Sequence, residues 1–107
     1  MNNSEYPNLK HFFSCYFNQD WDFEYATWEE AVERYVSDVI LLHLNQTIIE
    51  FGMFIKCNLA EKKLNRELGR LGCDIEPPGS ADGLLYKEWI VLLRNELVRL
   101  RDLKDSE

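Results

Sequence analysis

The chain has 107 residues, of which 46% are hydrophobic and 29% charged, and its formal net charge is −7. This length suffices for one domain with one hydrophobic core and excludes a second. The negative charge disfavours contact with nucleic-acid backbones, and the N-terminus lacks the basic and apolar regions of a secretory signal. No apolar stretch is long enough to span a membrane, so we expect a cytoplasmic protein.

Apolar residues recur at helical spacing through nearly the whole chain, and strand-like alternation is absent. We therefore predict an all-α fold, a single compact domain of about five helices that spans residues 1–107. The polar ends, 1–5 and 104–107, are expected to be frayed. The predicted helices cover residues 7–17, from Thr27 to the pair Ser37-Asp38, 38–56, 59–71 and 84–103.

Residues with strong preferences for helix ends support these boundaries. Pro7 suits a first turn, and Gly72 suits a left-handed helix end. The pairs Thr27 with Glu30 and Asn58 with Glu61 have the spacing of helix caps, and Asp38 is expected to cap the helix that follows it.

The helix predicted over 38–56 is the most hydrophobic, and we expect it to be central. Its main face carries Leu41, Leu44, Ile48, Phe51 and Ile55, and Leu42, Ile49 and Met53 are expected to widen that buried face. The three cysteines, Cys15, Cys57 and Cys73, have no paired spacing and are interpreted as reduced, buried thiols.

No motif of a catalytic site is present, so we expect no catalytic residue, no cofactor and no enzyme activity. His11 and Cys15 have the i, i+4 spacing of metal ligands, but no second ligand pair exists and we predict no metal. The basic residues after Lys56 alternate with acids, which is typical of a solvated helix face rather than of a phosphate-binding track.

The negative charge is concentrated in the first half of the chain. Residues 1–50 contain nine acids and two bases, whereas residues 51–107 contain ten of each. Six of the acids lie close together: Asp20, Asp22, Glu24, Glu29, Glu30 and Glu33.

Two interpretations of these six acids are open. They surround the start of a helix, where negative charge is favourable. They also accompany Trp21, Phe23, Tyr25 and Trp28, and aromatic anchors with a charged rim are typical of tight interfaces. An acidic surface of this kind favours a basic partner.

Two stretches of the chain resemble the signatures of a family of bacterial immunity proteins of contact-dependent growth inhibition, the CdiI family. The first stretch is Tyr6-Pro7-Asn8-Leu9, Phe12 and Tyr16-Phe17-Asn18-Gln19-Asp20-Trp21-Asp22. The second is Leu71-Gly72-Cys73, Pro77-Pro78, Gly83-Leu84, Tyr86 and Glu88-Trp89.

The resemblance implies that the chain binds the C-terminal toxin domain of a cognate CdiA-type effector, commonly a nuclease, as a monomer that binds the toxin 1:1. The signature residues are expected to be mainly structural: Tyr6, Pro7, Leu9, Tyr16, Phe17, Gln19, Trp21, Gly72, Cys73, Pro77, Tyr86 and Trp89. The six acids are then the hypothetical toxin-binding residues.

The sequence departs from the family in two places. The family often has His where this chain has Asn18, and Ser or Thr where it has Leu85, so these two positions do not carry the family's usual hydrogen-bonding side chains. The alternative function is an adaptor or regulatory domain that binds another basic protein. An upstream reading frame for a large secreted effector distinguishes immunity from this alternative.

Overall fold

The structure is a computed structural model that describes residues 6–73 and 85–106. These residues form helices and no strand, which confirms the prediction of an all-α single domain. The short helix α2 was not predicted, because four residues are too few to show a helical period. The helices are α1 (Pro7–Tyr16), α2 (Trp21–Glu24), α3 (Trp28–Asp38), α4 (Leu41–Lys56), α5 (Glu61–Arg70) and α7 (Tyr86–Asp105).

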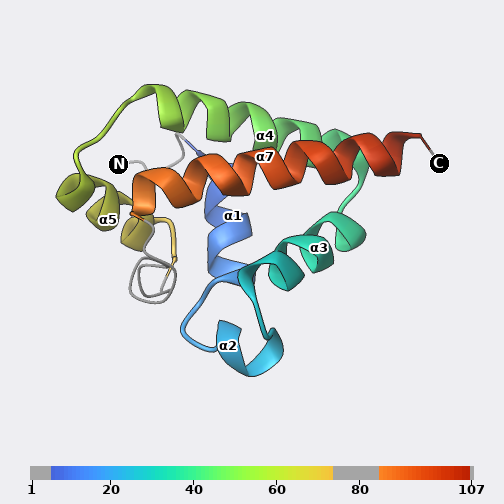
Figure 1. Ribbon diagram of the computed structural model, residues 1–107, viewed down its shortest axis with the longest axis horizontal. Helices are drawn as coiled ribbons and strands as arrows, with labels where there is room; N and C mark the ends of the chain where they lie inside the picture. Colours follow the sequence, from blue (N-terminus) through green and yellow to red (C-terminus); the bar gives the residue numbers. More distant parts are fainter. Residues whose placement is uncertain (1–5, 74–84, 107) are drawn as a thin grey trace.

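Two long helices form the frame of the domain. α4 and α7 lie side by side and run in opposite directions, and they make the most extensive helix pair of the fold (Figure 1). α1 packs against α4 and α3, α3 packs against α7, and α5 lies beside the first turns of α7. The connection through α2 forms one end of the molecule, away from the α4–α7 pair (Figure 1).

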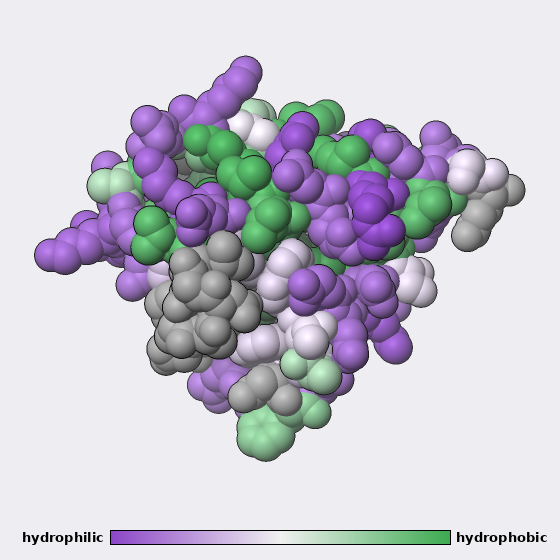
Figure 2. All heavy atoms as spheres, viewed as in Figure 1, coloured by the Kyte–Doolittle hydropathy of each residue, from purple (hydrophilic) through white to green (hydrophobic). Residues whose placement is uncertain are grey.

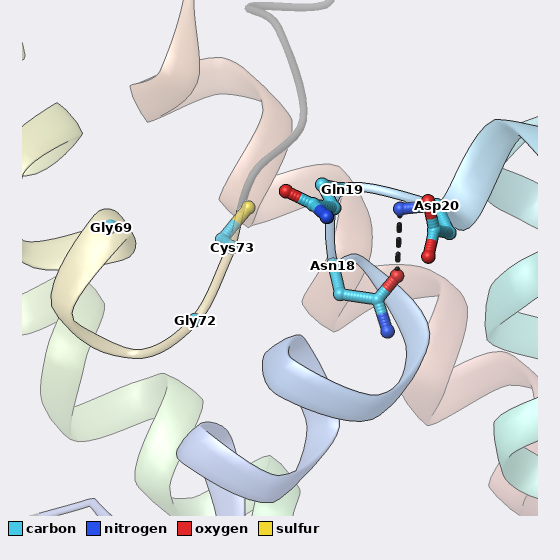
Figure 3. Close-up of a pocket in the computed structure, with 6 residues that line it drawn as sticks. All are labelled: Asn18, Gln19, Asp20, Gly69, Gly72 and Cys73. Carbon is cyan, nitrogen blue, oxygen red and sulfur yellow. Dashed lines mark hydrogen bonds between the residues drawn. The ribbon is translucent and has the colours of Figure 1, made fainter.

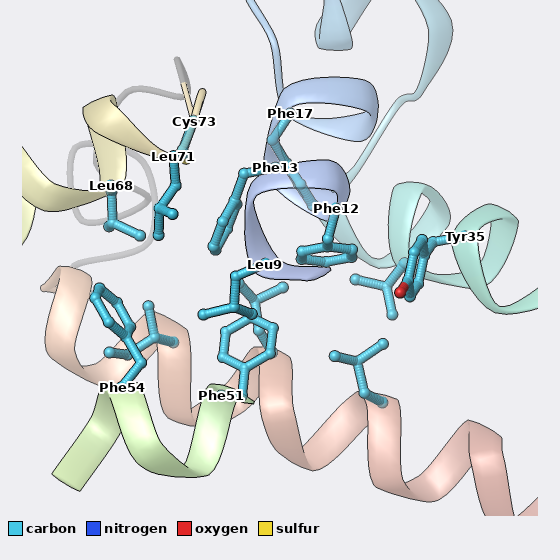
Figure 4. Packing of buried hydrophobic residues seen from close by; sticks show 14 of the residues in the cluster. Leu9, Phe12, Phe13, Phe17, Tyr35, Phe51, Phe54, Leu68, Leu71 and Cys73 are labelled. Carbon is cyan, nitrogen blue, oxygen red and sulfur yellow. The ribbon is translucent and has the colours of Figure 1, made fainter. Parts of the chain in front are cut away.

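The core is rich in aromatic rings that α1 contributes. Phe12 and Phe13 of α1 meet Phe51 of α4, with both ring-centroid distances at 5.7 Å (Figure 4). Phe17 extends this cluster to Trp89 of α7 at 5.5 Å. All five side chains are fully buried. Their edge-to-face contacts add specificity to the apolar burial.

A carboxylate of another helix caps the start of α1, which has no side-chain cap of its own. Glu50 of α4 accepts the backbone N–H of Asn8 at 2.9 Å and that of Leu9 at 3.0 Å. Its second oxygen accepts the side-chain amide of Asn8 at 2.6 Å. Pro7, as predicted, occupies the first helical position.

The α3–α4 corner differs from the prediction. α3 extends to Asp38, and α4 begins at Leu41 without a side-chain cap. Asp38 does not cap α4, because its carboxylate accepts hydrogen bonds from Tyr16 and Arg34 instead. Lys104 of α7 binds the corner, since its ammonium donates to the carbonyl oxygens of Val36 at 2.7 Å and Val39 at 2.8 Å. α7 therefore continues to Asp105, into the tail that was expected to be frayed.

The start of α5 also corrects the prediction. α5 begins at Glu61 after an uncapped Ala60, and Asn58 has a positive φ of 51° and makes no cap. Glu61 instead serves α7, where it accepts the backbone N–H of Tyr86 at 2.6 Å. The N–H of Leu85 is accepted by Glu88 at 2.9 Å. These two carboxylates accept the free backbone N–H groups at the start of α7, where this chain has no Ser or Thr hydroxyl to cap the helix.

A cap formed by Thr27 and Glu30 has two hydrogen bonds, one from each side chain to the backbone N–H of the other residue, and the structure contains one of them. The hydroxyl of Thr27 accepts the N–H of Glu30 at 3.3 Å. The carboxylate of Glu30 accepts the N–H of Ala26 at 3.2 Å rather than that of Thr27. At the end of α5, Gly72 has the predicted left-handed conformation, with φ at 96°.

Two predictions of burial were wrong. Leu42, Ile49 and Met53 do not widen the core face of α4, because they are exposed on the opposite side. Cys15 and Cys57 are exposed as well, and Cys73 alone among the cysteines is buried.

Candidate functional site

The acids singled out in the sequence gather at the end of the molecule that α2 and the first half of α3 form. We call Asp20, Glu24, Glu29, Glu30 and Glu33 the acidic end. All five side chains are exposed. Asp22 lies within α2, but its side chain is outside the described part of the structure.

The turn between α1 and α2 is built by Asn18. Its side-chain oxygen accepts the N–H of Asp20 at 2.9 Å, and its amide donates to the carbonyl of Ser14 at 3.2 Å. Trp21 then packs on the core residue Phe17 with a centroid distance of 6.0 Å. This local turn and the packing of Trp21 fix the direction of α2.

Helix periodicity places the glutamates of α3 on its outer surface. Ala31, Val32, Tyr35 and Val36 are buried, so Glu29 and Glu33, four residues apart, share a solvent-facing side. Like charges at this spacing disfavour the isolated helix slightly. Glu30 is partly satisfied by the N–H of Ala26, whereas within the described residues Asp20, Glu24 and Glu29 make no ion pair.

Two other acids of the first half of the chain do not belong to this surface. Glu50 caps α1, and Asp38 binds Tyr16 at 2.7 Å and Arg34 at 3.3 Å. The hydrogen bond from Tyr16, followed by the charge of Arg34, holds the pKa of Asp38 below its ordinary value. Among the described acids of residues 6–50, those whose exposed side chains bind no other helix are the members of the acidic end.

The acidic end influences a neighbouring tyrosine. Partial burial raises the pKa of Tyr25 above its ordinary value of 10.0, and the charge of Glu24 raises it further. Burial is the larger of these two causes, and the charge of Glu24 adds to it.

Only one of the four aromatic residues near these acids projects into solvent. Trp21, Tyr25 and Trp28 are half-buried against the core, and Trp28 meets Trp89 edge to face at 6.4 Å. Phe23 is 86% exposed. Figure 2 shows hydrophobic atoms at the tip formed by α2, next to the hydrophilic surface of the neighbouring segments.

An open hollow of about 520 Å³ adjoins the acidic end (Figure 3). It lies between the α1–α2 turn and the end of α5, and its lining consists of Asn18, Gln19, Asp20, Gly69, Gly72 and Cys73. The side chains of Gln19 and Cys73 point toward one another across it (Figure 3). No pattern in the sequence predicts this hollow, because its walls, at residues 18–20 and 69–73, are far apart along the chain.

The described residues offer no group of three or more His, Cys, Asp or Glu side chains that would hold a metal ion. His11 packs edge to face on His43 of α4, with centroids 5.5 Å apart. Among the described helices, none combines the length and the apolar character needed to cross a membrane.

The two signature stretches meet in space. Gly72 lies against Ser14 of α1, and a Cβ on Gly72 would stand 2.6 Å from the Ser14 Cβ. Most signature residues are buried or half-buried: Tyr6, Leu9, Tyr16, Phe17, Trp21, Cys73, Tyr86 and Trp89. Pro7 and Gln19 are exposed, and Pro77 lies outside the described residues.

These features define a small all-α domain with an acidic end and a shared aromatic framework. A family model described as CdiI immunity protein matches residues 5–97, which is most of the chain. The chain belongs to the CdiI immunity protein family and is an immunity protein of contact-dependent growth inhibition, which confirms the resemblance noted in the sequence. Comparison with curated proteins and with solved structures gave no match.

Proposed function

We propose that this protein neutralises a cognate CdiA-type toxin domain by binding it 1:1 in the cytoplasm, and that the toxin is a nuclease. Family membership supports the toxin as partner. The observation that supports the site is the set of exposed, largely unpaired carboxylates of the acidic end together with the exposed ring of Phe23.

The proposed mechanism is steric and electrostatic. A nuclease binds phosphates through basic side chains, and the carboxylates of the acidic end occupy those sites in place of substrate. Phe23 supplies the apolar anchor that a charged rim requires. A basic side chain of the toxin enters the hollow beside Asp20, where amide and carboxylate oxygens are available. Such a protein needs no catalytic residue and no cofactor.

Charge reversal tests the location. Glu29→Lys and Glu33→Lys alter the acidic end without removing a cap, whereas Glu30→Lys also removes the bond to Ala26 and is less informative. We expect each of the first two variants to weaken binding of the toxin domain encoded beside this gene by about tenfold or more. We expect the salt dependence of binding to decrease in parallel.

The control is Asp105→Lys, which makes the same charge change on an exposed residue at the end of α7. It should leave affinity within about twofold, since Asp105 belongs to α7 and not to the acidic end. Unchanged affinity in both glutamate variants and in Asp22→Lys would show that the toxin binds at another surface. Growth rescue by the wild-type protein would still establish immunity in that case.

Phe23→Ala separates anchoring from charge. The ring is exposed, so its removal should leave the thermal midpoint nearly unchanged. We expect a loss of affinity of about tenfold or more, seen mainly in the dissociation rate, whereas the glutamate variants act more on the association rate. Unaltered dissociation kinetics would show that the ring does not enter the toxin.

A further inference from the structure

The outward face of α4 is apolar although it lies on the protein surface. Leu42 is 65% exposed, Ile49 62% and Met53 52%, on the side of the helix opposite the buried Leu44, Ile48 and Phe51. We call Leu42, Gln46, Ile49 and Met53 the α4 stripe. Large side chains grouped on one exposed face mark an interaction surface more often than isolated ones do.

The stripe also lacks charge. Between Leu41 and Ile55 the only carboxylate is Glu50, and it is directed to the start of α1. The outer surface of a solvated helix normally carries charged residues, and a helix that is apolar all round is normally buried all round. The outward face of α4 therefore has the composition of a helix face that packs against another element.

The spacing of the stripe indicates a helix as the covering element. Its members follow one another at intervals of four, three and four residues, which is the seam of a two-stranded helical pair. These intervals occur in the same order from either end of the helix. An antiparallel second α4 thus places Leu42 opposite Met53 of the other copy and Gln46 opposite Ile49, while the thioether of Met53 adapts to the fit.

Charge favours this orientation and this partner. Lys56 continues the seam, so a parallel pair would set two Lys56 ammonium groups face to face, whereas an antiparallel pair separates them. Arg94 of α7 lies over Gly52, with its Nε 3.7 Å from the Cβ that an alanine would have there. In the antiparallel pair the two Gly52 positions stand about 14 Å apart along the axis, beyond the screening length.

A basic toxin is a poor occupant of the same face, because Arg94 and Lys56 flank it and no carboxylate attracts it there. The acidic end lies on the opposite side of the molecule from α4 (Figure 1), so two copies that meet through α4 keep their main negative charge apart. The covering element that fits is a second copy of the chain.

We propose that the α4 stripe is a self-association surface through which two copies pair antiparallel, each retaining its acidic end for a partner. This inference differs from the monomer expected from the sequence and does not depend on where the toxin binds. Three half-exposed side chains provide less area than a permanent dimer requires, so the dimer forms in a concentration-dependent way.

Sedimentation velocity from about 1 μM to about 1 mM tests the proposal across the range of weak interfaces. We expect the mass of the wild type to rise from that of one chain toward that of two, and Ile49→Asp to remain a single chain throughout. The matched control, Leu103→Asp, changes a 53% exposed leucine of α7 outside the stripe and should associate like the wild type. Unaltered circular dichroism establishes that the variants are folded.

The register has its own test. Leu42→Glu and Met53→Lys should each prevent pairing, and the double variant should restore it, because the antiparallel pair brings each new carboxylate against a new ammonium. A wild type that remains one chain at about 1 mM overturns the proposal, as does a dimer that Ile49→Asp leaves intact. The proposal is also overturned if the wild type is a monomer and the Ile49→Asp variant binds the toxin more weakly. That result would assign the stripe to the toxin interface.

Discussion

The hydroxyl of Tyr16 donates a 2.7 Å hydrogen bond to the carboxylate of Asp38, and this bond joins the end of α1 to the end of α3. It explains why Asp38 is not part of the acidic end, although the sequence places it in the same acidic half of the chain. Desolvation and this hydrogen bond together raise the pKa of the Tyr16 phenol, so the hydroxyl remains the donor at neutral pH.

Removing that donor should change the titration of Asp38. The folded-state pKa of Asp38 is lowered, chiefly by Tyr16, so its contribution to stability is present above the ordinary pKa of 3.8 and is lost as pH falls through the folded value. In Tyr16→Phe we expect the pKa of Asp38, followed by carbonyl NMR, to return toward 3.8. The stability difference from the wild type should be present at pH 7 and disappear under acid.

Tyr25→Phe is the comparison for this experiment, because Tyr25 makes no hydrogen bond to Asp38. It should leave the Asp38 titration close to that of the wild type. An Asp38 carboxyl that titrates identically in Tyr16→Phe and in the wild type would show that the bond does not hold in solution.

Glu50 is the only side-chain cap of α1 among the described contacts, and its removal should be costly. Glu50→Ala leaves the N–H groups of Asn8 and Leu9 without an acceptor, and we expect a loss of about 1–2 kcal/mol in the free energy of unfolding by urea. Glu33→Ala, an exposed glutamate outside any cap, should change it by less than about 0.5 kcal/mol. Equal effects would contradict the capping role.

The contacts of Glu50 and Lys104 show how far the sequence could predict this fold. Apolar periodicity identified the long helices, because each buries one face in the core. It could not locate the α3–α4 corner, since Val39 and Ile40 continue the apolar pattern and the corner is held by Lys104, which lies 65 positions after Val39. Capping by a distant residue leaves no local signal.

The same limit applies to the surfaces. Composition identified the acidic half of the chain, yet Asp38 and Glu50 differ from the members of the acidic end only through partners on other helices. In α4, Leu41 and Leu42 are adjacent residues of the same type, and only the packing of the helix determines that Leu42 is exposed. Apolar residues on more than one side of a helix predict a wide buried face, which is why Leu42, Ile49 and Met53 were expected in the core.

The buried pair Tyr35 and Thr47 should behave as a coupled unit. Thr47 donates to the carbonyl of His43 at 3.1 Å, so Tyr35 donates to the Thr47 hydroxyl at 2.6 Å. Thr47→Val deprives the buried phenol of its acceptor, and we expect a loss of about 1–3 kcal/mol. Tyr35→Phe should cost less, since Thr47 keeps its bond to His43.

A double-mutant cycle measures this coupling. The variant with both Tyr35→Phe and Thr47→Val should lose less stability than the two single losses combined, by about 0.5 kcal/mol or more. Strict additivity in urea unfolding would mean that the two hydroxyls do not interact.

Gly72 and Gly69 offer opposite outcomes for the same substitution. Gly72 combines a φ of 96° with backbone contact, since an added Cβ would stand 2.9 Å from the Ser14 Cα. Gly72→Ala therefore strains the backbone and pushes α5 away from α1, and we expect a loss of about 1–3 kcal/mol in unfolding free energy. Gly69 lies within α5 with nothing inside 4 Å of its added Cβ, so Gly69→Ala should gain about 0.5–1 kcal/mol. Thermal unfolding of both variants checks the prediction, and a Gly72→Ala protein as stable as the wild type would show that α5 does not dock on Ser14 through this glycine.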